Sequence, residues 1–229
     1  MYVFVFLLLS GHALSETTKV NVAVGEWPPY ASESLPHGGL LPLIIKRALS
    51  FADIEATIFF MSWDDAYEKT LNKQYDISPG WLKTHERESD MLFSQPMSYI
   101  NLRFFHSKDN ELSWNNIDDI YSLKLGIVPG YSYGPELDQS IKKKLISSAF
   151  YENDRAALIG LANKEIDLYP ADAIVAEYLL NKLPSSQQDN ISFDEQTLSH
   201  SPIFLIQAKQ TPNTVLDAFN NGLNKLKNN

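Results

Sequence analysis

Strand-like and helix-like segments alternate along almost the whole chain, and this alternation constrains the fold more than any other feature. Residues 19–24 alternate polar and apolar side chains, so they predict a first strand, and residues 56–61 predict a second. Between them, residues 40–52 have a helical pattern. The second half repeats the order, with strands expected at 124–128 and 166–169. The pattern predicts an α/β fold with largely parallel sheets.

Several helix ends can be predicted from side chains that are able to cap them. Ser62, Thr84, Asn153 and Asp172 each precede a helix-like segment and can accept a hydrogen bond from its first turn. Another helix is expected over residues 135–147. The last helix is expected to start at Thr211, which is followed by a proline.

Residues 75–96 carry an unusual arrangement of charge. A strand-like run is interrupted by Pro79 and Gly80, and Arg87 then falls in the first turn of the helix that Thr84 caps. A cation is unfavourable there because a helix start carries positive partial charge. Arg87 therefore needs an anionic partner. A ligand carboxylate is one candidate, and the neighbouring acids are the other: Glu86, Glu88 and Asp90.

Composition limits the compartment and the kinds of partner. The chain has no cysteine, which excludes disulfides and a thiol-linked lipid anchor. Its formal net charge of −9 argues against nucleic acid and anionic membrane surfaces, but not against a small anionic ligand. The histidines lack metal-ligand spacing and no phosphate-binding glycine loop is present, so we expect neither a metal nor a cofactor.

The first fifteen residues predict an export signal. An apolar run covers residues 3–9, Ser10 and Gly11 break it, and small residues follow for cleavage. The run is too short to span a bilayer. No Lys or Arg precedes it, which is atypical of a signal, and a buried first strand is the alternative. Export would place the mature chain in the periplasm as a free soluble protein.

Several short motifs follow one another in a specific order. They are Trp27-Pro28-Pro29-Tyr30, Asp76, Thr84-x-x-Arg87, Phe93-Ser94-x-Pro96, Gly130-x-Ser132 and Asp167 followed by Asp172. In this order and spacing the chain resembles the bacterial extracellular solute-binding proteins of family 3, the receptors of polar amino-acid ABC importers. The resemblance implies a two-lobed, periplasmic-binding-protein-like (type II) α/β fold, with mixed sheets flanked by helices and a cleft between the lobes. Lobe 1 would comprise 17–104 and 199–229, and lobe 2 would comprise 105–198, joined by two crossover strands.

The resemblance also implies ligand contacts. Arg87 matches the arginine that grips a ligand carboxylate, for which its planar fork is suited; the alternative is a surface ion pair. Asp172 matches the acid that takes the ligand amino group, and it can cap a helix at the same time. Ser132 matches a lobe-2 hydroxyl in a turn that can bind an anion. Tyr131 and Tyr133 are bulky for that turn, so we expect one of them in the cleft.

The remaining candidates lie in lobe 1. Trp27 and Tyr30 match the aromatic wall of the ligand site, although core packing is the alternative for one of them. Glu26 ends the first strand and can pair with a basic ligand or remain solvated. Gly80, Trp81 and Lys83 lie between the break and Arg87. Lys83 can supply a second positive charge or simply lie exposed.

Pro79, Gly80 and Trp81 depart from the family pattern, which has small and hydroxyl residues there. This departure indicates a divergent subgroup whose ligand differs from the common amino acids. Three functions remain open: a monomeric receptor that binds a small carboxylate-bearing solute for an ABC permease, a dehydratase of the exported cyclohexadienyl or arogenate type, or a sensory module without a transporter. Because no diagnostic catalytic constellation is present, the receptor is favoured and no catalytic residue is expected.

Overall fold

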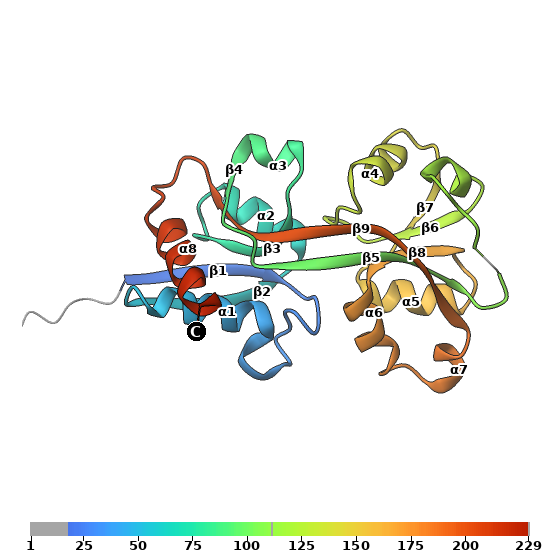
Figure 1. Cartoon of the computed structure of the whole chain (residues 1–229), viewed down its shortest axis with the longest axis horizontal. Coiled ribbons are helices and arrows are strands. Elements are labelled where there is room, and N and C mark those ends of the chain that lie inside the picture. The colour runs from blue at the N-terminus through green and yellow to red at the C-terminus, as the bar shows by residue number, and fades with distance from the viewer. Residues whose placement is uncertain (1–17, 111, 229) are drawn as a thin grey trace, which may run out of the picture.

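The molecule has two lobes joined by two long strands. The computed structural model describes residues 18–110 and 112–228, so the predicted export signal at 1–15 lies outside the described residues. β5 (Ser98–Ser107) and β9 (Ile191–Ala208) run antiparallel to each other through both lobes (Figure 1). The two-lobed α/β architecture is thereby confirmed. The residue limits given for each lobe remain a prediction.

The first lobe contains both ends of the described chain. β1 (Thr18–Gly25) pairs in parallel with β2 (Ile54–Met61). β3 (Ser78–Leu82) and β4 (Met91–Phe93) pair antiparallel with β9. The helices of this lobe are α1 (Leu40–Ser50), α2 (Trp63–Leu71), α3 (His85–Asp90) and α8 (Thr214–Lys227), with the 3₁₀ turn η1 at Pro36–Gly38.

The second lobe is built around the other end of β5. β6 (Lys124–Ile127) pairs in parallel with β7 (Ser147–Phe150) and β8 (Leu168–Asp172), and β8 pairs antiparallel with β5. Its helices are α4 (Pro135–Lys142), α5 (Asp154–Ala162), α6 (Ala173–Leu180) and α7 (Ser185–Gln188), with η2 at Ile117–Ile120. The expectation of largely parallel sheets is wrong because the crossover strands pair antiparallel with each other and with β3, β4 and β8.

The same aspartate contact recurs in both lobes. The Asn21 N–H donates to Asp76 Oδ2 at 2.7 Å, and the Asp76 N–H donates back to the Asn21 carbonyl at 2.9 Å. In the second lobe the Lys124 N–H donates to Asp167 Oδ2 at 2.7 Å, and the Asp167 N–H returns a bond of 2.8 Å to the Lys124 carbonyl. Each aspartate thus ties the first strand of its lobe to a later segment, so both have a structural role.

The predicted helix caps are confirmed. The side chains of Ser62, Thr84, Asn153 and Asp172 all accept hydrogen bonds from the first turns of α2, α3, α5 and α6. The expected start of the last helix at Thr211 is wrong. The Gln207 side-chain amide donates to the carbonyls of Thr211 and Pro212, and α8 begins only at Thr214.

Two other expectations need correction. The helix expected over 135–147 ends at Lys142, because Lys143 caps it and Lys144 leaves the helical conformation with a φ of +57°. Ser147–Phe150 then pairs with β6 as a strand. The interruption expected at Pro79 and Gly80 lies inside β3. There the register shifts between Pro79 and Trp81, which makes a bulge, and Gly80 takes a φ of +90°. A glycine tolerates this conformation, so the strand continues through it.

Helices α1 and α8 pack closely at Gly222, which is fully enclosed. A Cβ on Gly222 would lie 2.0 Å from the Ala48 carbonyl oxygen. We predict that Gly222→Ala lowers the free energy of unfolding by about 1–3 kcal/mol because the helices must move apart. Chemical denaturation measures this change. The exposed neighbour Asn221 is the control: if Asn221→Ala costs as much as Gly222→Ala, the close helix approach is not the cause.

Candidate functional site

A small cavity of about 50 Å³ lies between the two lobes, and residues of both line it. Its walls come from the turn after β1, the start of α2, β3 and α3 in the first lobe, the crossover strand β5, and the ends of β6 and β8 in the second lobe. Most of the residues predicted for a ligand site line it: Trp27, Gly80, Trp81, Arg87, Ser132, Tyr133 and Asp172. Glu26, Tyr30 and Lys83 do not.

Arg87 joins the two lobes. One guanidinium nitrogen donates to the Leu82 carbonyl at 2.9 Å, and the other donates to the Gly130 carbonyl of the second lobe at 2.8 Å. The guanidinium carbon lies 4.7 Å from the centre of a Trp81 ring. Burial lowers the pKa of Arg87, and nearby Tyr67 and the carboxylates of Asp138, Glu86 and Asp64 partly offset this shift.

The neighbouring acids do not neutralise Arg87. Glu86 Oε1 lies 2.8 Å from Lys142 Nζ, and Glu88 Oε1 lies 3.5 Å from Lys83 Nζ. Within residues 18–110 and 112–228, no ion pair joins Arg87 to a carboxylate. The local surface ion pair that was one of the two alternatives is therefore not formed, and the guanidinium faces the cavity with backbone carbonyls as its partners.

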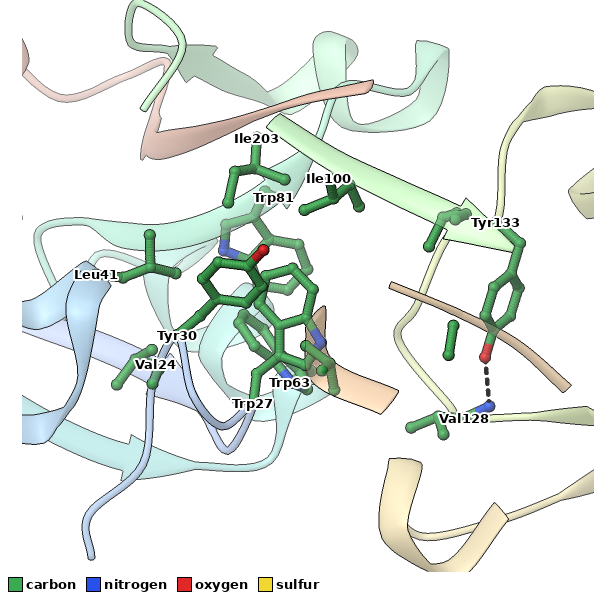
Figure 2. Close-up of a cluster of buried hydrophobic side chains, with 14 of the residues drawn as sticks. Val24, Trp27, Tyr30, Leu41, Trp63, Trp81, Ile100, Val128, Tyr133 and Ile203 are labelled. Atoms are coloured by element: carbon green, nitrogen blue, oxygen red, sulfur yellow. Dashed lines mark hydrogen bonds between the residues drawn. The ribbon is translucent and has the colours of Figure 1, made fainter. Parts of the chain in front are cut away.

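Three tryptophans form the first-lobe wall. The ring centres of Trp63 and Trp81 are 5.2 Å apart, and those of Trp27 and Trp63 are 6.3 Å apart, both edge-to-face. Figure 2 shows these rings together with Tyr30, and with Tyr133 and Val128 of the second lobe opposite. Trp63 was missed from the sequence. Trp63 directly follows the predicted cap Ser62. This cap was the sequence signal for placing Trp63 at the start of a helix.

The second-lobe wall contains a buried carboxylate held by two tyrosines. The Tyr131 hydroxyl donates to Asp154 Oδ2 at 2.7 Å, and the Tyr169 hydroxyl donates to Oδ1 at 2.8 Å. Asp154 is only 3% exposed, and burial raises its pKa although these hydroxyls partly offset the effect. The Tyr133 hydroxyl accepts from the Val128 N–H at 2.8 Å. The sequence prediction missed Asp154, which directly follows the predicted cap Asn153.

The turn at Ser132 already binds an anion from the protein itself. The Ser132 hydroxyl donates to Asp138 Oδ2 at 2.5 Å, and the Tyr133 N–H donates to Asp138 Oδ1 at 2.8 Å. Burial raises the pKa of Asp138, and these two donors partly offset it. The turn therefore has the geometry to bind an anion. However, the Ser132 hydroxyl, which was expected to contact a ligand, donates its hydrogen bond to Asp138 of α4.

Asp172 is also held by groups of the protein. Its Oδ1 accepts from the N–H groups of Ile174 and Val175, both at 3.1 Å, and from the Tyr30 hydroxyl at 3.2 Å. Its Oδ2 accepts from the Asn101 N–H of β5 at 3.0 Å. Burial raises the pKa of Asp172, and the hydrogen bonds lower it in part. Tyr30 thus does not line the cavity but reaches a residue that does.

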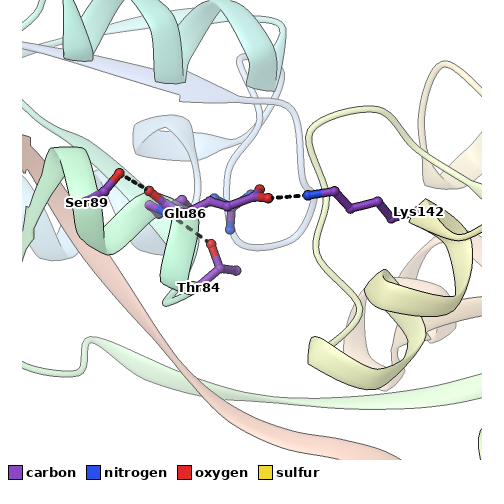
Figure 3. Close-up of polar contacts among 5 residues, drawn as sticks. Thr84, Glu86, Ser89 and Lys142 are labelled. Atoms are coloured by element: carbon purple, nitrogen blue, oxygen red, sulfur yellow. Dashed lines mark hydrogen bonds and ion pairs between the residues drawn. The ribbon is translucent and has the colours of Figure 1, made fainter.

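The side chains of the two other predicted residues do not line the cavity. Glu26 is exposed and accepts from the Glu33 N–H at 2.8 Å. Lys83 is exposed, lies 5.1 Å from the centre of the Phe93 ring and borders a wider groove, which shares Arg87 and the turn at Gly130–Tyr133 with the cavity. Across this groove the exposed pair Glu86 and Lys142 joins α3 to α4 (Figure 3).

The described residues contain neither a metal-binding cluster nor a membrane-spanning helix. Within them, no group of three or more His, Asp or Glu side chains is arranged to hold a metal ion. In the same part of the chain, no helix combines the length and the apolar character needed to cross a bilayer.

Comparison with known proteins identifies the family. The family model described as bacterial extracellular solute-binding proteins, family 3, matches residues 20–229, so the chain belongs to this family. A search of curated proteins gave no match.

Solved structures share the fold. An ancestral arginine-binding protein bound to arginine is 19% identical with a TM-score of 0.78, and the match covers 92% of this chain and 93% of that chain. An arginine transport-system periplasmic binding protein from Legionella pneumophila is 18% identical with a TM-score of 0.77, covering 93% and 95%. A histidine kinase sensor domain is 15% identical with a TM-score of 0.79, covering 93% and 92%. At these identities the likeness concerns the fold alone.

The buried Asp154 generates a prediction about pH. Because its pKa is raised in the folded state, the unfolded chain loses this proton first as pH rises above about 4, and the folded state loses stability through that window. Asp154→Asn removes this loss. Denaturation experiments measure the free energy of unfolding of Asp154→Asn and of the wild type at each pH. The difference, variant minus wild type, should therefore increase between pH 4 and pH 7. The exposed Asp189→Asn is the control, and a constant difference for Asp154→Asn would contradict the prediction.

Proposed function

We propose that this chain is an exported periplasmic receptor that clamps a small carboxylate-bearing solute, of about amino-acid size, and delivers it to an ABC permease. The observation that carries the proposal is Arg87, a cation that lines the cavity between the lobes and has no carboxylate partner in the described part of the chain. The family supports the receptor role, because its description is one of extracellular solute-binding proteins.

Arg87 is suited to grip a carboxylate. Arg87 is partly buried, and a charge shielded from water is costly unless it is paired, which favours an anion at this position. The guanidinium has five N–H donors, and the two bonds to Leu82 and Gly130 leave donors available for a planar, two-oxygen contact. Its bond to the Gly130 carbonyl also links the first lobe to the second. The same side chain would therefore bind the solute and favour closure over it.

The size of the cavity supports a hinged mechanism. Its volume is about 50 Å³, whereas an engineered protein cavity that binds benzene has a volume of roughly 150 Å³. A solute of amino-acid size therefore needs the lobes to separate, and bending of β5 and β9 would provide this motion. The solute first meets Arg87 and the Trp27–Trp81 wall, and the second lobe then closes with Tyr131, Tyr133 and Asp172. Closing requires no covalent step, so we propose no catalysis.

Proteins with this fold bind ligands that carry a carboxylate. One neighbour is bound to arginine, and the GluR0 ligand-binding core from Nostoc punctiforme is in complex with glutamate, at 17% identity and a TM-score of 0.74. A monomer is the proposed oligomeric state, as is usual for such receptors. The proposed periplasmic location depends on the predicted export signal.

Replacing Arg87 tests the proposal directly. We predict that at least one member of a panel of amino acids, dicarboxylates and monocarboxylates raises the melting temperature of the wild type, because a ligand of the folded state stabilises it by mass action. Arg87→Ala should fold but lose this rise. The control is Arg47→Ala, which removes an exposed arginine of α1. An unchanged rise in the Arg87→Ala protein would contradict the proposal.

The hinge can be tested by a distance measurement between the lobes. The chain has no cysteine, so Ser89→Cys on α3 and Lys143→Cys beside α4 provide two exposed sites for spin labels. We predict that the carboxylate with the strongest effect in the thermal panel shortens and narrows the distance distribution. Labels at Ser89 and Asn224, both in the first lobe, should not respond. Identical distributions with and without the carboxylate would contradict the clamp.

A further inference from the structure

The carboxylate expected to bind a ligand amino group is already occupied by the protein. Asp172 is 2% exposed and accepts four hydrogen bonds, from the N–H groups of Asn101, Ile174 and Val175 and from the Tyr30 hydroxyl. A carboxylate offers about four acceptor positions in all. Oδ1 takes three of these bonds and is saturated, and Oδ2 takes one, so an ammonium group could approach Asp172 only through Oδ2.

The Tyr30 hydroxyl is the donor that crosses between the lobes. Tyr30 is 4% exposed, and its ring centre lies 4.6 Å from that of Trp27. Its carbonyl accepts from the Leu41 N–H at 2.8 Å, which fixes the turn to the start of α1. A rigidly held hydroxyl thus stands against Asp172 where a ligand amino group was expected.

The other carboxylates at or beside the cavity, in the described part of the chain, are also engaged by donors of the protein. Both oxygens of Asp154 accept tyrosine hydroxyls, and Asp138 is bound by Ser132 and the Tyr133 N–H. The other lining is largely aromatic and aliphatic. It includes Trp63, Trp81, Ile100, Leu102, Pro170 and Ala171. Burying an unpaired ammonium against such surface is costly, whereas an apolar body is favourable there.

Resting on the proposed function, we infer that this cleft prefers carboxylates that lack an α-amino group and carry an apolar or aromatic body. Tyr30 sets the preference by occupying Asp172 with its hydroxyl. Arg87 takes the carboxylate, and the tryptophan wall takes the body. The preference therefore depends on a residue that lies behind the cavity wall.

The experiment compares pairs of acids that differ only in the α-amino group. The probes are 3-phenylpropanoate against L-phenylalanine, and 4-methylpentanoate against L-leucine, measured by isothermal titration calorimetry. The wild type should bind the deaminated member of at least one pair about tenfold or more tightly, since an unpaired buried polar group costs that much or more.

Tyr30→Phe tests the residue. This variant keeps the ring against Trp27 and removes only the hydroxyl, so Asp172 Oδ1 loses one of its three donors and the space taken by the hydroxyl opens beside the carboxylate. The preference for the deaminated acid over its amino acid should fall by about tenfold, or the amino acid should become the tighter ligand. Tyr99→Phe is the control, because Tyr99 is exposed on β5 and stacks on His200 away from the cavity. Circular dichroism and the melting temperature establish that each variant is folded.

The outcomes separate this inference from the proposed function. Equal or tighter binding of the amino acids by the wild type overturns the ligand class, and so does absence of binding for all four acids. An unchanged ratio in Tyr30→Phe overturns the role of Tyr30. The proposed function fails separately, if no carboxylate of the wider panel stabilises the wild type in an Arg87-dependent way.

Discussion

The hydrogen bond between the Arg87 guanidinium and the Gly130 carbonyl is the contact on which the arrangement of the cleft depends. It places a cation of α3 against the backbone of the second lobe, 2.8 Å from the oxygen. Close packing at Gly130 makes this approach possible, because a Cβ there would lie 2.6 Å from an Asp64 carboxylate oxygen. A side chain at this point would hold the lobes apart, and Arg87 would then lose its partner across the cleft.

The acids of the cleft show a common principle. Asp138, Asp154 and Asp172 are each held by donors of the protein, and burial raises the pKa of each. The second lobe therefore presents a surface whose carboxylates are already satisfied. Arg87 differs, because its hydrogen-bond partners are neutral carbonyls. This asymmetry is the physical basis for expecting an anionic solute.

Much of the local structure could be predicted, and the errors share one cause. The caps at Ser62 and Thr84 are correct because capping depends on a few adjacent residues. The last helix was placed at Thr211 because its sequence is a good helix start, yet the Gln207 side chain holds that turn outside α8. Local preference was overridden where a distant or neighbouring segment offered better hydrogen bonds.

The residues of the candidate site likewise fall into those that the sequence indicated and those that it missed. Motif order indicated Arg87 and Asp172, and both line the cavity. Trp63 and Asp154 were missed because a preceding cap marks only the start of a helix and not which helix starts face the other lobe.

The sequence by itself determined the alternation of strands and helices, the helix caps and the family to which the chain belongs. These properties depend on side-chain periodicity and on contacts within one or two turns. Only the tertiary structure decided which groups meet across the lobes. Tyr30 and Asp172 are 142 residues apart, and their hydrogen bond exists only because the crossover strands bring the two lobes together. The partners of a buried charge are set by such long-range packing, which no local pattern encodes.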